Sequence, residues 1–242
     1  MKIRTNYVSN SSSSSFIIKT FNKNNIIDLL YQFVETINLD DNLSKEDIRN
    51  CFTKKLEESE ETQKNFLKTY LSIEFNEIFY NALRYYLAKR DYELSDCKKC
   101  VYYATDFKKK QKGKCNGCSY LRLKEKVNYY KRDFKIAKDK VNDFNFKSDL
   151  KYIKKMIYDA EVIRTINDDM CVKEDWDTWC DWFFKKTDEY IQLWLTKHPN
   201  SYVLSFSSDS GDEKESFVRS NILDLIAFLQ NNHIDGFYSE NS

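Results

Sequence analysis

Residues 11–21 read SSSSSFIIKTF, a run of five serines that passes directly into an apolar stretch. The segment from Phe16 to Phe21 has the composition of a short strand. We expect the serines to lie against this strand or to lead straight into it, with their hydroxyls satisfying backbone groups where larger side chains would not fit. Two alternatives stay open from the sequence alone: a flexible linker, because polar low-complexity runs are commonly mobile, and a phosphate-binding or phosphorylated loop.

The C-terminal end offers partners for this strand. Residues 202–206 read as a strand, 207–212 as a turn, 222–229 as a helix and 234–238 as a second short strand. A strand–helix–strand unit has too few strands to be stable by itself. We therefore expect the strand after the serines to complete a small sheet with the two C-terminal strands.

The rest of the chain is predicted to be helical. Only four glycines and one proline occur among 242 residues, too little turn chemistry for a many-stranded barrel or sandwich. Apolar periodicity predicts helices over 24–39, 61–94, 120–144 and 173–197, and two more are expected to begin at Ser44, through a capping box with Asp47, and at Ser148. The predicted fold class is mainly α with a small β-sheet (α+β), a helical bundle joined to a terminal β-α-β unit.

These elements suggest five regions along the chain. They are a serine-rich segment with its strand (1–22), a helical region (23–96), a four-cysteine module (97–118), a second helical region (119–199) and the strand–helix–strand unit (200–242). No run of about 18 apolar residues occurs, and the N-terminus lacks the apolar segment of a signal peptide. We expect a cytoplasmic protein with no membrane association.

Four of the seven cysteines have the spacing of a metal site. They form two C-x-x-C turns, Cys97 with Cys100 and Cys115 with Cys118. Two such turns complete the tetrahedral thiolate shell that zinc favours, and four protein ligands leave no open position for catalysis. We predict a structural zinc ion; the alternatives are a redox dithiol pair or coincidentally buried thiols. Cys51 and Cys180 have no such spacing and are interpreted as small buried apolar residues.

A heptad follows the cysteines. Its apolar positions alternate three and four residues apart over about three and a half repeats, the pattern of a helix that packs lengthwise on another: Tyr120, Leu123, Val127, Tyr130, Phe134, Ala137, Val141 and Phe144. The simplest partner is the helix before the cysteines, since neighbouring elements usually pack together. This predicts an antiparallel helical hairpin with the zinc at its tip. An intermolecular coiled coil is the alternative, so the oligomeric state stays open.

Charge is distributed unevenly along the chain. The formal charge is only +1, yet residues 97–155 carry 19 lysines and arginines against 6 acidic residues, and residues 156–242 carry 7 against 17. A metal-tied loop that presents lysines beside aromatic rings suits phosphate contact and base stacking. The basic side chains expected to contact nucleic acid are Lys108, Lys109, Lys110, Lys112, Lys114, Lys124, Lys131 and Arg132. A merely solvated charged face is the competing interpretation.

The acidic end of the chain suggests a different kind of partner. Four tryptophans fall within nineteen residues, and Trp182 is offset from the stripe that the others form. Aromatic anchors are typical of protein interfaces. The alternative function is therefore an inhibitor or adaptor, of the anti-defence type, that binds a host protein through this acidic, tryptophan-rich third.

Catalytic motifs are not recognisable in the sequence. The usual nucleotide-binding, hydrolase and zinc-protease patterns do not occur, and the two histidines, His198 and His233, both sit where helices are expected to end. An enzyme that uses scattered carboxylates is the third and least favoured hypothesis. The leading expectation is a zinc-stabilised binding protein that engages a nucleic acid or nucleoprotein complex.

One stretch of the sequence resembles a motif found at the N-terminus of other proteins. Residues 7–16, YVSNSSSSSF, preceded by Lys2 to Arg4, resemble the N-terminal FVSNSSSSSF motif shared by uncharacterised proteins of bacteria and their phages, with Tyr7 where phenylalanine is usual. The resemblance covers about 20 residues and implies an association with phages or other mobile elements. It carries over no catalytic role.

Overall fold

The computed structural model describes residues 13–39, 42–94, 119–159, 162–164, 170–172, 176–207 and 212–241. The chain divides into two compact units: Met1–Ile73 with Glu189–Ser242 form unit 1, and Glu74–Asp188 form unit 2. Helices α3 (Glu60–Leu94) and α7 (Trp176–Lys197) each contribute residues to both units. None of the described helices combines the length and the apolar character needed to cross a lipid bilayer.

Unit 1 contains the sheet that the sequence predicts. Its strands are β1 (Ser13–Ile18), β4 (Tyr202–Ser207) and β5 (Gly236–Asn241). Strand β1 lies in the centre and pairs antiparallel with both neighbours, so that Phe16 is opposite Leu204 on one side and Tyr238 on the other. The N-terminal strand therefore joins two C-terminal strands that do not touch each other in the sheet.

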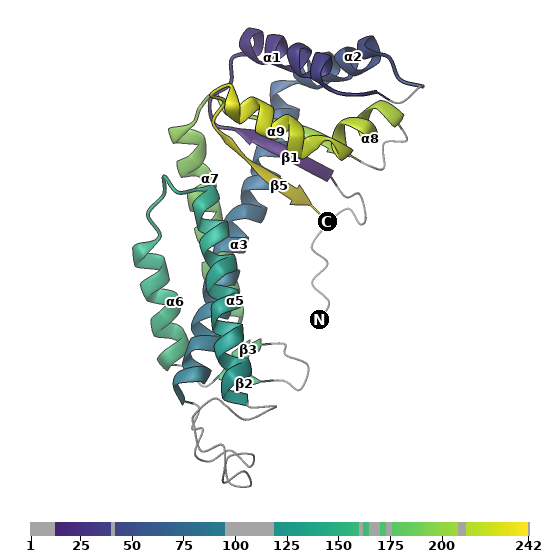
Figure 1. The fold of residues 1–242 in the computed structure, drawn as a ribbon. Helices are drawn as coiled ribbons and strands as arrows, with labels where there is room; N and C mark the ends of the chain where they lie inside the picture. Colours follow the sequence, from purple (N-terminus) through teal and green to yellow (C-terminus); the bar gives the residue numbers. More distant parts are fainter. Residues whose placement is uncertain are drawn as a thin grey trace, which may run out of the picture. The chain divides into compact units, whose positions relative to one another are not determined.

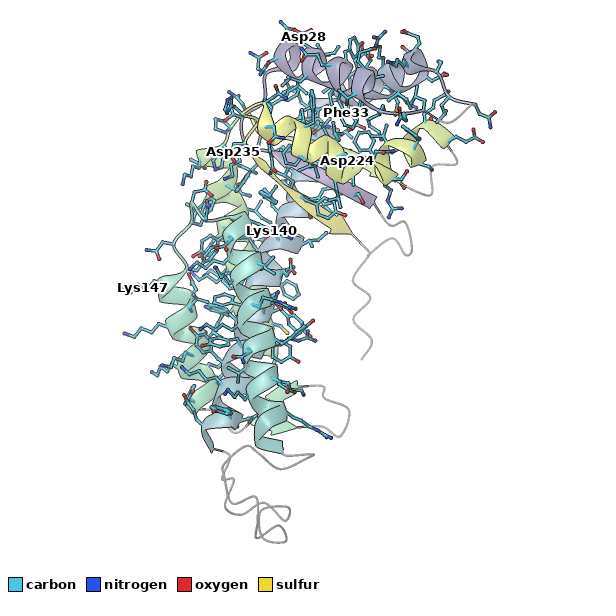
Figure 2. All side chains as sticks on the ribbon, in the orientation of Figure 1. Asp28, Phe33, Lys140, Lys147, Asp224 and Asp235 are labelled. Atoms are coloured by element: carbon cyan, nitrogen blue, oxygen red, sulfur yellow. The ribbon has the colours of Figure 1, made fainter. Side chains whose placement is uncertain are left out.

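Four helices cover one face of this sheet (Figure 1): α1 (Lys23–Thr36), α2 (Lys45–Leu56), α8 (Glu213–Ser220) and α9 (Ile222–Asn231). Their apolar sides pack on Phe16, Ile18 and Leu204 to form a continuous hydrophobic core. Phe33 of α1 meets Phe228 of α9 with ring centroids 5.6 Å apart, on the side of α1 away from Asp28 (Figure 2). Helix α2 begins at the predicted capping box of Ser44 and Asp47.

The serines form part of the opposite face of the sheet. Because side chains alternate along a strand, Ser13, Ser15 and Ile17 share this face. Ser15 is directly opposite Ser205 on β4 and Ser239 on β5, which places three serines in one row across the sheet. The hydroxyl of Tyr70, on α3, lies 2.7 Å from that of Ser13 and 2.8 Å from that of Ser205. The small serines thus leave room for a helix-borne tyrosine that binds their hydroxyls.

A glutamine protects the edge of the sheet. The Gln63 side chain accepts a hydrogen bond from the Val203 N–H at 3.0 Å and donates one to the Val203 carbonyl at 3.3 Å. Its amide therefore takes the place of a further strand beside β4. An edge satisfied in this way cannot template pairing with another chain at that residue.

Unit 2 consists mainly of the second half of α3 with α5 (Ser119–Lys140), α6 (Lys147–Asp159) and the first part of α7. Figure 1 shows these helices side by side. Paired residues give their directions: Glu74 meets Lys140 and Arg84 meets Tyr130, so α5 runs antiparallel to α3. A short antiparallel hairpin, β2 (Val162–Arg164) and β3 (Met170–Val172), stands between α6 and α7 in the chain.

Aromatic rings fill the centre of unit 2. Phe75 contacts Phe144 and Phe146, with ring centroids 5.8 and 6.3 Å apart, and Phe79 contacts Phe146 and Phe183. Helix α3 buries residues on more than one side, because its apolar residues are not confined to one stripe. It is the element around which the other three helices pack.

The predicted fold class is confirmed, with differences in detail. Strand β1 begins three residues earlier than expected and includes Ser13–Ser15, so these serines are not a linker. Helix α8 and the β2–β3 hairpin were not predicted, because they are too short to show a clear period in the sequence. Helix α6 begins at Lys147, whose N–H is capped by the Asn145 side chain, and Ser148 lies inside its first turn.

Candidate nucleic-acid interface

The candidate interface is built on the hairpin of α3 and α5. The seam predicted from the heptad packs within the chain: Phe134 stacks on Tyr85 with ring centroids 6.3 Å apart, and Tyr130 receives the Arg84 guanidinium at 5.6 Å. These contacts occupy the seam with intramolecular partners. The predicted helical hairpin is therefore present in unit 2.

The hairpin brings two ends of chain together. Because α3 and α5 are antiparallel, the end of α3 at Leu94 and the start of α5 at Ser119 lie at the same end of the pair (Figure 1). The predicted zinc ligands follow Leu94 and precede Ser119 in the sequence: Cys97, Cys100, Cys115 and Cys118. They lie outside the described residues, as do the loop lysines Lys108, Lys109, Lys110, Lys112 and Lys114.

Helix α5 presents a stripe of lysines to solvent. Lys124, Lys131 and Lys138 are seven residues apart, and Lys135 stands between the last two. At 100° per residue, these four positions fall within about 60° of the helix circumference. All four side chains are exposed, and none forms an ion pair or hydrogen bond within the part of the chain that the structure describes. Two of them, Lys124 and Lys131, were predicted as nucleic-acid contacts.

Helix α6 carries a second set of exposed lysines, which were not among the predicted nucleic-acid contacts. Its side chains Ile153 and Ile157 are buried, and the opposite side bears four exposed lysines. These are Lys147, at the start of the helix (Figure 2), Lys151, Lys154 and Lys155. The signal was present in the sequence, because spacings of three and four residues place these lysines together, opposite the apolar stripe.

The balance of charge on this segment is strongly positive. Residues 119–159 contain 12 lysines and arginines but 6 acidic residues. Of the acidic residues, Asp149 is buried and lies 3.8 Å from Lys186, and Asp133 is 3.3 Å from the guanidinium of Arg132. The 12 basic and 6 acidic residues leave the segment with a net formal charge of +6, which favours attraction of a polyanion.

Lys140 differs from the exposed lysines because it is part of the packing. Its ammonium lies 2.9 Å from the buried carboxylate of Glu74 and 3.4 Å from that of Glu77. Burial by itself would lower the pKa of Lys140, but the charges and hydrogen bonds of Glu74 and Glu77 outweigh it and raise that pKa. Lys140, labelled at the end of α5 in Figure 2, therefore holds the hairpin together and is not available to a ligand.

The predicted partner-binding tryptophan also takes part in packing. Trp182 is half-buried, and its ring lies 4.7 Å from that of Tyr152 and 5.7 Å from that of Phe79. Phe184, two residues further along α7, is 53% exposed. Phe184 is therefore more accessible than Trp182.

Unit 1 contains a pocket lined by charged side chains, and these charges serve the packing of the unit. It measures about 330 Å³ and is lined by α2 and α8 residues. Lys55 and Glu215 form an ion pair of 2.8 Å in it, and Glu215 also accepts a hydrogen bond from the Ser207 N–H. Burial raises the pKa of the Cys51 thiol to about 11, so this cysteine is a poor nucleophile. The charges of the pocket join α2, α8 and β4.

Both histidines follow the C-terminal end of a helix. His233 ends α9 with a φ of 64°, and the N–H groups of His233 and Ile234 donate to the carbonyls of Gln230 and Leu229. This is the Schellman motif of a helix C-terminus. His198 follows α7, and its ring packs 4.4 Å from that of Trp194. Among the described residues, no group of three or more His, Cys, Asp or Glu is placed to hold a metal ion.

Comparison with known proteins gave no match to a family profile, a curated protein or a solved structure.

Proposed function

We propose that unit 2 binds nucleic acid, with contacts to the phosphate backbone made by the exposed lysines of α5 and α6. The observation that carries the proposal is the set of seven exposed lysines that have no partner within the described residues: Lys124, Lys131, Lys135, Lys138, Lys147, Lys151 and Lys155. On both helices these lysines present ammonium groups that form no ion pair within the described residues. Such an array attracts a polyanion through the release of its counterions.

The four cysteines extend this proposal to the tip of the hairpin. Four thiolates in two C-x-x-C turns are a donor set that suits zinc. A zinc ion bound by Cys97, Cys100, Cys115 and Cys118 would tie the start and the end of the segment that joins α3 to α5. The loop lysines between the cysteine pairs would then add to the positive surface.

Binding to labelled oligonucleotides at increasing salt tests the proposal. We expect measurable affinity at low ionic strength that falls steeply as salt rises. Replacing Lys131, Lys135 and Lys138 by glutamine should weaken binding to all sequences and reduce the slope of log K against log salt by roughly 2 to 3.

A matched control is available in unit 1. Lys23, Lys64 and Lys68 are also exposed and form no ion pair within the described residues. Their replacement by glutamine changes the net charge by the same amount and should leave the affinity nearly unchanged. Equal losses in the two triple variants, or no binding at low salt, would refute the proposed interface.

A protein partner remains the second candidate. Phe184 is exposed on α7 between the exposed carboxylates Asp181 and Asp188, spaced three and four residues away. These three side chains share one side of the helix. We propose this acidic aromatic surface as the contact for a basic host protein, tested by co-purification before and after Phe184→Ala and Trp182→Ala.

A further inference from the structure

Three tyrosine rings and two guanidinium groups form a continuous series of contacts on the α3–α5 hairpin. On α3, the Arg84 guanidinium carbon lies 4.3 Å from the ring centroid of Tyr80. The same carbon is 5.6 Å from the centroid of Tyr130 on α5, whose ring is 5.4 Å from that of Tyr129. Arg132 continues the series 5.1 Å from the Tyr129 ring. We call these five residues the tyrosine–arginine ladder.

The two outer rings of the ladder are open to solvent. Tyr80 is 43% exposed and Tyr129 is 52% exposed, and the Arg132 side chain is 65% exposed. The inner members Arg84 and Tyr130 are half-buried, which fixes the spacing between the two helices. Flat surfaces at both ends of the ladder are therefore available to a ligand, while the middle is held in place.

The guanidinium groups of the ladder keep much of their hydrogen-bonding capacity. Arg84 contacts two rings and forms no ion pair with a carboxylate within the described residues. Among the carboxylates of the described residues, Arg132 pairs only with that of its neighbour Asp133, at 3.3 Å. Glu77, one turn before Tyr80, is already paired with Lys140. The edges of both guanidinium groups can thus donate to phosphate or to base oxygens.

We propose that the tyrosine–arginine ladder is a stacking platform for the bases of a single-stranded nucleic acid. This inference depends on the proposed function, since it assigns the bases to the ladder and the phosphates to the exposed lysines of that interface. Aromatic rings and arginine planes bind unpaired bases by stacking, with little preference for sequence. In a duplex the faces of the bases are already stacked on each other, so a duplex would use the lysines alone.

The test compares a fluorescein-labelled 20-nucleotide deoxythymidine strand with a duplex of equal length, at one fixed salt concentration. The double substitution Tyr80→Leu and Tyr129→Leu removes both exposed rings while it keeps apolar bulk on the helices. It should weaken single-strand binding by on the order of tenfold or more, because each stacked base contributes several-fold to affinity. Duplex binding should not change.

A matched variant retains the rings. Tyr80→Phe with Tyr129→Phe removes only the hydroxyls and should keep single-strand affinity within about twofold, since stacking needs the ring alone. Circular dichroism checks that each variant is folded. Should the leucine variant fail to fold, Arg84→Lys gives the same discrimination, because it keeps the charge but loses the planar group, and we expect it to weaken only single-strand binding.

The outcomes separate this inference from the proposed function. Unchanged single-strand binding in the leucine variant would overturn the ladder as a platform, as would equal losses for single strand and duplex. A wild-type protein that prefers the duplex would also overturn it while leaving the lysine interface intact. Absence of any binding at low salt would instead refute the proposed function and the ladder with it.

Discussion

His233 shows how a single residue can carry local strain. Its φ of 64° is the left-handed conformation that the Schellman motif after α9 requires, and a side chain makes that conformation unfavourable. We expect His233→Gly to stabilise the protein by about 0.5–1 kcal/mol, after allowing for the greater entropy of glycine in the unfolded chain. Thermal unfolding measures the change. His233→Ala keeps the strain and should give no gain; an equal gain from alanine would contradict this account.

Gly236 is required by close packing at the start of β5. A Cβ added there would lie 2.3 Å from the Ile17 carbonyl oxygen and 2.7 Å from a ring carbon of Phe16. Both neighbours belong to the central strand and cannot move freely. Gly236→Ala should therefore destabilise the protein by about 1–3 kcal/mol, the usual cost of overpacking, measured by urea denaturation. Asp235→Ala, at an exposed neighbouring position, should cost less than about 0.5 kcal/mol.

At the scale of the element, the buried face of β1 brings together hydroxyls that are hydrogen-bonded and a hydroxyl that is not. The Tyr70 hydroxyl is bonded to Ser13 and Ser205, whereas the Ser15 hydroxyl is fully buried and has no hydrogen-bond partner among the described residues. Tyr70→Phe should cost about 1–2 kcal/mol, because it leaves a buried serine unsatisfied. Ser15→Ala should instead stabilise by about 1 kcal/mol, since it removes an unpaired buried hydroxyl.

Chemical denaturation of the two variants decides between these situations. We expect the free energy of unfolding to fall in Tyr70→Phe and to rise in Ser15→Ala. A loss of stability in Ser15→Ala would show that the hydroxyl of Ser15 has a partner in solution and that its burial is not a cost.

The α3–α5 pair is held by the ion pair between the half-buried Lys140 and the buried Glu74. Lys140→Met leaves the Glu74 carboxylate buried without its cation and should destabilise the protein by about 3–5 kcal/mol. The double variant with Glu74→Leu should recover most of that loss, because both charges are then gone. Urea denaturation of the single and double variants measures the coupling. Equal stability of the two variants would contradict the pairing.

The same pair makes a prediction about pH. The pKa of Lys140 is raised in the folded protein, so its contribution is fully present below the unfolded lysine pKa of about 10.4. The contribution is lost as pH rises through the higher folded pKa. From pH 7 upward, we therefore expect the stability difference between wild type and the Lys140→Met, Glu74→Leu variant to shift against the wild type only when the pH is strongly alkaline. A shift near pH 7 would refute this assignment.

At the scale of the whole molecule, the zinc prediction can be checked directly. We expect one zinc ion per chain by elemental analysis, and a lower melting temperature after chelation or after Cys97→Ser, because a structural zinc ion contributes to folding free energy. Cys51→Ser is the control: it lies in unit 1, outside the predicted ligand set, and should not change the zinc content. Protein without zinc, or with an unchanged melting temperature after chelation, would refute the metal site.

Local patterns along the chain predict its helices well. The capping box at Ser44, the multi-sided apolar pattern of α3 and the heptad of α5 each depend on residues within a few turns of one another. Such signals exist before any tertiary contact forms. The lysine stripe of α6 belongs to the same class, and helical spacing alone would have revealed it.

Contacts between distant residues could not be predicted in the same way. Some hydrogen bonds join positions that are 57 to 140 residues apart. They are the bonds of Gln63 with Val203 and of Tyr70 with Ser13 and Ser205. Nothing in the local pattern of α3 distinguishes Gln63 from an ordinary surface glutamine. The ladder is similar, because Arg84 meets Tyr130 only after α3 and α5 have packed.

The amino-acid sequence by itself determined which segments become helices, where the sheet strands lie approximately, and where positive charge and cysteines concentrate. These properties follow from periodicity, capping and composition, all of which act over short distances along the chain. The tertiary structure decided that the serines belong to the central strand, that Lys140 is half-buried and paired with Glu74, and that tyrosines and arginines of two helices contact one another. Those outcomes depend on which surfaces meet, and a surface exists only once the chain has folded.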